Sequence, residues 1–249
     1  MKKIHYIVAS LLFIAFGSSA QNRIISIQSG VNLPYGQLAA HGEGGHSHEG
    51  EEGHDHSKDK ENGYAGPGFQ VGIQYAKTKL NGFGYAFQVN YSSFGLSNKK
   101  EWAGEIAEAF EVGELSLRIY NGYTSLGILA GPTYTFGTEK LQVDAQLLVG
   151  FNSLTTPKYD ATPEFEAETR FTRNSSTVNG FAIQAGLNVR YALSEKWQLS
   201  AHVFNYFATG KSDYTYENLL NPSELIATKF QIPITFFGAG LGISYVIGK

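Results

Sequence analysis

The sequence predicts an all-β fold, an eight-stranded antiparallel up-and-down transmembrane β-barrel. Three observations lead to this prediction. Apolar residues alternate with small or polar residues along eight stretches. The connections between the stretches are alternately long and short, and aromatic residues gather at the ends of the stretches. The composition agrees, because the 249 residues include 29 glycines, 15 tyrosines and 17 phenylalanines. No cysteine is present, and no basic cluster indicates a nucleic-acid partner.

The N-terminal segment has the parts of a secretory signal peptide. Lys2 and Lys3 precede an apolar run over residues 4–16, and small residues occupy 17–20. We expect residues 1–20 to be a cleaved signal peptide and residues 21–249 to form one outer-membrane β-barrel domain. The alternative, an uncleaved anchor helix, is disfavoured because the apolar run is short and a cleavable small-residue site follows it.

Eight segments show the period-two alternation of a strand with one apolar face. We expect the apolar row to face lipid and the other row, rich in Gln, Asn, Ser and Gly, to fill the lumen with hydrogen bonds. Eight strands enclose a space that side chains just fill, so we expect no open pore. The alternative is a soluble lipocalin-like barrel, which would have to bury the aromatic rows. The segments are 25–33, 69–77, 83–91, 126–136, 141–152, 181–191, 197–207 and 234–247.

Short turns are expected at 78–82, 137–140 and 193–196, where the first contains Asn81-Gly82. Long connections are expected at about 37–66, 94–122, 154–178 and 210–231. Transmembrane barrels have long extracellular loops and short periplasmic turns, which places both termini on the periplasmic side.

Two long connections contain patterns of their own. Trp102, Ile106 and Phe110 recur at helical spacing and predict a short surface helix, and residues 115–119 alternate like a strand. Residues 164–171 alternate as in a hairpin that extends into water.

Three irregularities are expected in the strands. The apolar phase changes near Asn121-Gly122, and Pro132 removes a main-chain donor inside a strand. The phase also changes between Ile234 and Phe237, beside Pro233, which predicts a bulge there and a membrane-spanning part that starts near Phe237.

Aromatic residues at the strand ends predict two girdles at the membrane interfaces. Residues 181–191 and 197–207 each extend from one girdle to the other, and ten residues of tilted strand rise about 25 Å. One girdle is Tyr75, Phe83, Tyr85, Tyr134, Phe136, Tyr191, Trp197 and Tyr245; the other is Phe69, Tyr91, Phe151, Phe181, Phe207 and Phe237.

The pattern resembles the eight-stranded outer-membrane β-barrel domains of Gram-negative bacteria, which include the membrane part of OmpA-like proteins. The matching stretches are residues 30–36 (GVNLPYG) and 131–136 (GPTYTF), and Gly242, Tyr245 and Ile247 resemble a barrel-assembly signal. The resemblance implies outer-membrane location, insertion by the barrel-assembly machinery, contact with membrane lipid and lipopolysaccharide, a monomer, and no periplasmic domain after Lys249.

A tract in the first long connection carries five of the seven histidines. Imidazole and carboxylate groups bind Zn²⁺, Cu²⁺ and Ni²⁺, and the tract interleaves both. We therefore expect a metal site there, and the alternative is an acidic segment kept soluble by its charge. The histidines are His41, His46, His48, His54 and His56.

Two pairs of lumen-facing residues carry other chemistry. Asp144 and Arg190 lie at similar distances from their turns on neighbouring strands, which predicts a buried ion pair. Ser200 and His202 share one face of a strand and suggest an esterase, but no nucleophile motif surrounds Ser200.

We therefore expect a protein without catalytic activity that presents its long loops for surface interaction or envelope integrity. Two alternatives stay open: a metal-binding surface protein, and a narrow pore or lipid-modifying enzyme.

Zinc binding by the histidine tract is directly testable. We expect isothermal titration calorimetry with Zn²⁺ to show saturable binding to the purified protein, because the tract supplies five imidazoles. Replacing all five histidines by Ala should remove it. Equal heats for the two proteins would contradict the prediction.

Overall fold

The computed structural model describes residues 22–39, 63–109, 113–163, 171–218 and 225–248, and of residues 210–218 and 225–232 it describes only the backbone. The expected signal peptide lies outside these ranges. Of the residues described, none belongs to a helix long and apolar enough to cross a membrane.

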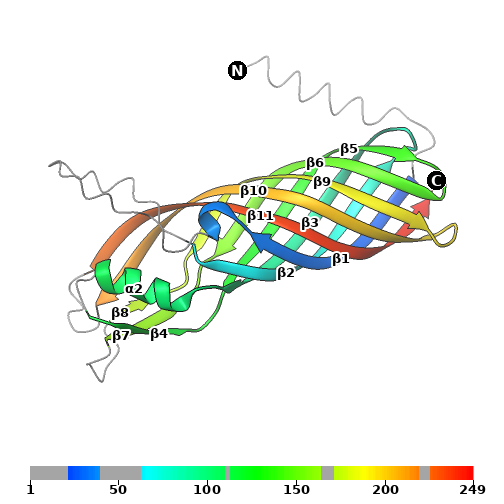
Figure 1. Ribbon diagram of the computed structural model, residues 1–249. Helices are drawn as coiled ribbons and strands as arrows, with labels where there is room; N and C mark the ends of the chain where they lie inside the picture. Colours follow the sequence, from blue (N-terminus) through cyan, green and yellow to red (C-terminus); the bar gives the residue numbers. More distant parts are fainter. Residues whose placement is uncertain (1–21, 40–62, 110–112, 164–170, 219–224, 249) are drawn as a thin grey trace, which may run out of the picture.

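Eight antiparallel strands close into a barrel, which confirms the predicted fold class (Figure 1). Each strand pairs with the next, and β11 pairs with β1 from Ile25↔Tyr245 to Leu33↔Phe237. The closure leaves no free edge inside the membrane, where an unpaired main-chain group finds no water. The strands are β1 (Asn22–Pro34), β2 (Ala65–Thr78), β3 (Gly82–Leu96), β5 (Tyr123–Gly137), β6 (Leu141–Thr155), β9 (Thr177–Ala192), β10 (Trp197–Asn218) and β11 (Leu225–Gly248).

The two faces of the strands differ as the alternation predicts. Outward residues such as Ile27 and Phe151 are 61% and 74% exposed, whereas their inward neighbours Gln28 and Asn152 are 6% and 2% exposed. The outward rows therefore form an apolar band around the barrel. Such a band is stable in contact with lipid, because exposure of apolar side chains to water is unfavourable.

Aromatic rings meet across strands at both ends of the band. At the end with short turns, Phe83 packs edge-on against Tyr134 with ring centroids 5.0 Å apart, and Trp197 packs against Tyr245 at 4.9 Å. At the other end the rings of Phe69 and Tyr91 lie 6.4 Å apart. These contacts match the two predicted girdles.

The predicted tight turns are present. Asn81 has φ +54° and Gly137 has φ +127°, values that Asn and Gly tolerate better than other residues. Short turns of this kind join β2 to β3, β5 to β6 and β9 to β10, and in transmembrane barrels such turns face the periplasm.

The opposite end of the barrel carries an outer subdomain, which we define as α2 (Lys99–Ala109), β4 (Leu115–Ile119), β7 (Tyr159–Pro163) and β8 (Phe171–Arg173). Strand β4 pairs with β7, β7 with β8, and β8 with the far end of β10. Figure 1 shows these elements together at the end away from the C-terminus. The predicted helix is confirmed at Trp102 and Ile106, and so are the strand at 115–119 and the break before β5. Phe110 and residues 164–170 of the expected hairpin lie outside the described residues.

The expected long connection at 210–231 is wrong. Strand β10 continues to Asn218 and β11 begins at Leu225, and the two stay paired from Gly210↔Ile232 to Glu217↔Leu225. Each strand supplies the other with main-chain partners beyond the membrane, so the ladder persists without an apolar outer row. The prediction relied on that apolar row and therefore stopped the strands too early.

The expected bulge beside Pro233 is also wrong. The β10–β11 register passes through Thr209↔Pro233 and Ala208↔Ile234 without a shift. Ile234 and Phe236 are 1% and 0% exposed because they point into the lumen. The apparent change of phase therefore marks a lumen that becomes apolar at this level.

At Pro132 the expected irregularity is present. Pairing of β5 with β6 is interrupted between Ala130↔Val149 and Thr133↔Gln146, and the register is the same on both sides. The missing main-chain donor of proline accounts for an interruption that does not shift the register.

Glycines on the inner face of β11 make room for lumenal rings. A Cβ on Gly238 would lie 2.2 Å from Cζ of Phe204, so Gly238→Val should lower the free energy of unfolding by about 1–3 kcal/mol through overpacking. The neighbouring Ala239→Val, on the lipid side, should change it by less than about 0.5 kcal/mol. Urea unfolding in lipid vesicles measures both, and equal losses would contradict the assignment of faces.

Candidate functional site

A buried ion pair lies in the lumen near the end with short turns. Nε of Arg190 donates to Oδ2 of Asp144 at 2.7 Å, and Nη2 donates to Oδ1 at 2.8 Å. Both side chains are 2% exposed. The predicted pair is therefore confirmed, and its two parallel bonds give it the bidentate geometry that fixes the positions of both groups.

Neutral polar groups complete the shell of this pair. Oγ1 of Thr135 donates to Asp144 at 2.7 Å, and Nδ2 of Asn188 donates at 3.3 Å. Nη1 of Arg190 donates to Oε1 of Gln198 at 2.9 Å. Strands β5, β6, β9 and β10 thus meet at one carboxylate–guanidinium pair, and its polar atoms are occupied by the barrel itself.

A glutamine layer fills the middle of the lumen. Nε2 of Gln74 donates to Gln146 at 3.0 Å, and Nε2 of Gln184 donates to Gln88 at 3.0 Å. A space of about 10 Å³ remains among these side chains, enough for roughly one water molecule. The predicted hydrogen-bonded lumen is confirmed at this level.

Above this layer aromatic and aliphatic side chains join the polar groups of the lumen, which adds an apolar part to the expected filling by Gln, Asn and Ser. The ring of Phe236 lies 5.1 Å from Phe94 and 4.6 Å from Tyr206, measured between centroids. The hydroxyl of Tyr206 donates to Asn152 at 2.8 Å. Rings and aliphatic side chains from several strands therefore close the lumen at the level of the outer girdle.

Ser200 and His202 do not form a catalytic pair. Nε2 of His202 lies 3.0 Å from Nε2 of Gln70, while Oγ of Ser200 has no hydrogen-bond partner among the described residues. The two side chains are 1% and 7% exposed and pack against the bare inner face of β11. Without a base beside the hydroxyl, the arrangement lacks the first requirement of nucleophilic catalysis.

The outer subdomain has an aromatic core of its own. Trp102 stacks on Tyr64 with centroids 5.9 Å apart and meets Tyr159 edge-on at 4.8 Å. Cζ of Arg173 lies 5.6 Å from the centre of the Tyr159 ring. Ile106 and Phe171 are buried in the same cluster. This core explains why α2 is held in place although its apolar stripe is weak. Its two large apolar residues, Trp102 and Ile106, belong to a cluster that contains Tyr64, Tyr159 and Phe171.

An exposed patch on the outer subdomain is centred on Tyr120. Cζ of Arg118 and Nζ of Lys158 lie 5.4 Å and 5.5 Å from the centre of its ring. The Tyr120 hydroxyl donates to the carboxylate of Asp160, and that hydrogen bond raises the pKa of Tyr120 above its usual value. A half-exposed tyrosine between two cations has the residue types that dominate binding surfaces.

The five histidines predicted to bind metal lie outside the described residues. Within the described ranges, no three His, Asp or Glu side chains gather closely enough to hold a metal ion. Zinc, copper or nickel binding by the histidine tract therefore stays a prediction.

The observations above decide the class of the molecule. Eight strands close on themselves, the band between two aromatic girdles is apolar, and the lumen is filled. This is the architecture of an eight-stranded outer-membrane barrel. Long connections and an outer subdomain extend from one end, and short turns join the strands at the other.

Comparison with known proteins adds little beyond the fold. No protein-family model and no curated protein sequence matches the chain. Solved structures with a similar fold include the outer membrane protein OprG from Pseudomonas aeruginosa, with 13% identity and a TM-score of 0.48 over 94% of this chain and 99% of that one. Neisserial surface protein A matches with 10% identity and a TM-score of 0.45 over 90% and 97% of the two chains.

The outer membrane protease OmpT from Escherichia coli matches with 8% identity and a TM-score of 0.47 over 93% of this chain and 99% of that one. At these identities the likeness concerns the fold alone.

Sequence reasoning missed the Tyr120 patch and the apolar part of the lumen. The patch joins residues from two distant connections, and only the β4–β7 pairing brings them together. The apolar lumen did leave a trace in the sequence, because Phe204, Tyr206 and Phe236 belong to the inward rows of their strands.

Removing one member of the ion pair should destabilise the barrel. Arg190→Met leaves a buried carboxylate without its counter-charge and should cost about 3–5 kcal/mol of unfolding free energy. Replacing both groups (Asp144→Leu with Arg190→Met) should recover much of that loss, because no lone charge stays buried. Urea unfolding in vesicles measures both variants, with Lys140→Met on the exposed turn as control. An unchanged midpoint for Arg190→Met would contradict the prediction.

Proposed function

We propose that the protein is a non-enzymatic outer-membrane scaffold that presents its outer subdomain to partners at the cell surface. The observation that carries the proposal is a division of roles. The lumen is packed, with room for about one water in its glutamine layer, whereas a separate aromatic core stabilises structure outside the apolar band.

The Tyr120 patch supports a binding role for the outer subdomain. Arg118 lies on β4, Tyr120 directly follows β4 and Lys158 directly precedes β7, and pairing of the two strands rather than a flexible tether holds these residues. A pre-organised surface binds with a smaller loss of conformational entropy than a disordered loop. In this proposal the barrel itself contacts lipid and lipopolysaccharide and acts as a monomer.

An enzymatic role has no comparable support. The residues that suggested an esterase are buried and lack a mutual hydrogen bond, and the lumen around them is filled by Phe204 and Gln70. A pore needs a continuous aqueous path, and the stacked rings of Tyr206 and Phe236 obstruct one.

The test compares a deletion strain complemented by three proteins: the full chain, a trimmed barrel and a patch variant. In the trimmed barrel, short Gly-Ser turns replace residues 99–119 and 157–175. Main-chain bonding between Thr156 and Ser176 lies outside the second cut. The patch variant is Arg118→Glu with Lys158→Glu. We expect attachment of cells to surfaces and to one another to fail in the deletion strain and to return only with the full chain.

Envelope integrity serves as the matched readout. The trimmed barrel should restore any detergent resistance that the deletion strain loses, because its membrane-spanning part is intact. Single-channel recordings of the purified protein should show no conductance steps. Full attachment with the trimmed barrel, or clear conductance steps, would overturn the proposal.

A further inference from the structure

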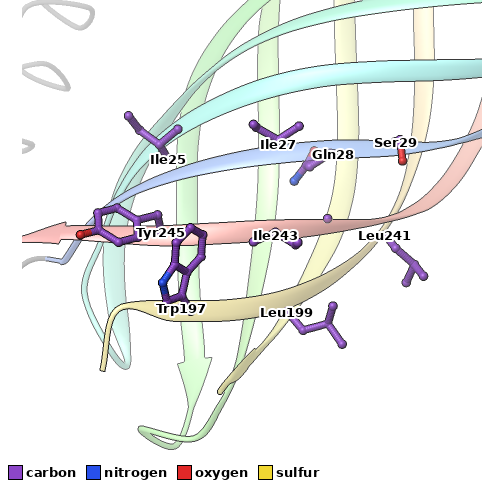
Figure 2. Close-up of a pocket in the computed structure, with 10 residues that line it drawn as sticks. Ile25, Ile27, Gln28, Ser29, Trp197, Leu199, Leu241, Ile243 and Tyr245 are labelled. Atoms are coloured by element: carbon purple, nitrogen blue, oxygen red, sulfur yellow. The ribbon is translucent and has the colours of Figure 1, made fainter. Parts of the chain in front are cut away.

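An apolar groove of about 580 Å³ runs along the outer wall of the barrel, over β10, β11 and β1. Ile27, Leu199, Leu241 and Ile243 form its sides, and Trp197 and Tyr245 stand together at one end (Figure 2). Gln28 and Gly242, which are register partners across the β1–β11 seam, also belong to the lining. The groove lies where the first and last strands of the barrel meet.

The groove covers much of the thickness of one membrane leaflet. Trp197 and Tyr245 belong to the girdle at the short-turn end, so the groove starts at that interface and runs toward the middle of the band. The lining residues Ile25 and Ser29 are four positions apart on β1, about 13 Å along a strand. At a strand tilt of about 40° this is about 10 Å along the membrane normal. Half of a hydrocarbon core of about 30 Å is about 15 Å. An acyl chain of the periplasmic leaflet therefore fits the groove lengthwise.

Two cations face each other on β1 and the neighbouring strand β2, beyond the end of the groove that Trp197 and Tyr245 mark, and neither of them lines the groove. Arg23 and Lys77 are direct register partners on β1 and β2, and both belong to the outward rows of their strands. Arg23 lies two residues before Ile25, in the same outward row of β1 and nearer the end with short turns. Like charges directly opposite on one sheet face destabilise the pairing. No ion pair to an acidic group is found for either cation within the described residues.

An anion at this position would remove the repulsion. A guanidinium and an ammonium side by side suit a phosphate, because Arg offers a fork of donors and Lys a point charge. The turn between β9 and β10 does not change the net positive charge at this place, because its exposed residues Glu195 and Lys196 carry opposite charges.

We propose that the groove binds one anionic phospholipid of the periplasmic leaflet, with an acyl chain between β10 and β1 and its phosphate at Arg23 and Lys77. A second copy of the chain fits less well. A two-fold contact centred on the seam would bring the partner's cations toward this pair and add further repulsion.

Trp197 lines the groove and serves as the probe. The chain has two tryptophans, so Trp102→Phe leaves Trp197 as the only one. Full-length protein is reconstituted in vesicles of unbrominated phosphatidylcholine. One series contains increasing fractions of phosphatidylglycerol with brominated acyl chains, and a second series contains phosphatidylcholine with brominated acyl chains. Bromine quenches indole fluorescence at contact, so the curves report which lipid occupies the groove.

We expect the brominated phosphatidylglycerol to associate at Trp197 about threefold more strongly than the brominated phosphatidylcholine, a modest ratio typical of partly exposed charges. Arg23→Gln with Lys77→Gln should bring the ratio to about one, and so should high salt. Filling the inner end of the groove with Ser29→Phe should reduce quenching by both lipids.

The matched control moves the probe to the opposite wall. Tyr134 lies in the same girdle on β5, which is four strands away from β11 in either direction. A protein with Tyr134→Trp, Trp197→Phe and Trp102→Phe should show no preference between the lipids. Heat-dependent gel migration confirms folding of every variant.

Two outcomes overturn the proposal. Equal quenching of Trp197 by both lipids would mean that the groove holds ordinary bulk lipid. Absence of quenching by either lipid, with cross-linking between copies of a Leu199→Cys variant, would mean that a second copy covers the groove.

Discussion

Main-chain hydrogen bonding inside the membrane is the constraint on which the rest of this structure depends. No water reaches the hydrocarbon region, so every N–H and C=O of the eight strands needs a partner in the chain. Pairing of β11 with β1 meets this need and closes the barrel. Closure in turn divides each strand into a lipid row and a lumen row. The polar, aromatic and glycine residues of the lumen row then have to fill a space of fixed width.

The lumen meets that requirement in two different ways along the barrel axis. Near the short turns, Asp144 and Arg190 satisfy one another and four strands converge on them. Toward the outer end, Phe204, Tyr206 and Phe236 pack together while the glycines of β11 leave room for the rings. A polar network specifies which strands meet, because a wrong register would bury a lone charge. Packed rings close the lumen without that specificity. The two devices together explain a barrel that is both unique in register and filled.

The two ends of the molecule carry different features. The outer subdomain is a second folded unit with its own aromatic core, and it presents Tyr120 between two cations. The end with short turns instead carries Arg23 on β1 and Lys77 on the neighbouring β2, beyond the end of an apolar groove at the closing seam. The proposed role at the cell surface and the proposed lipid at the seam are therefore independent of one another, since they use separate residues at opposite ends of the barrel.

The sequence by itself determined which residues face lipid and which face the lumen, because a period of two admits one assignment once the apolar row is known. It also determined the turns at Asn81 and Gly137 and the neighbouring strands that pair Asp144 with Arg190. Only the tertiary structure decided what depends on distant segments. The extensions of β10 and β11 exist because each strand is the other's partner, and the rows that continue the lipid-facing phase are largely polar there. Ile234 and Phe236 likewise appeared to break the phase of β11, because apolar residues can lie against lipid or in a dry lumen. Only the neighbours of a side chain distinguish these two environments.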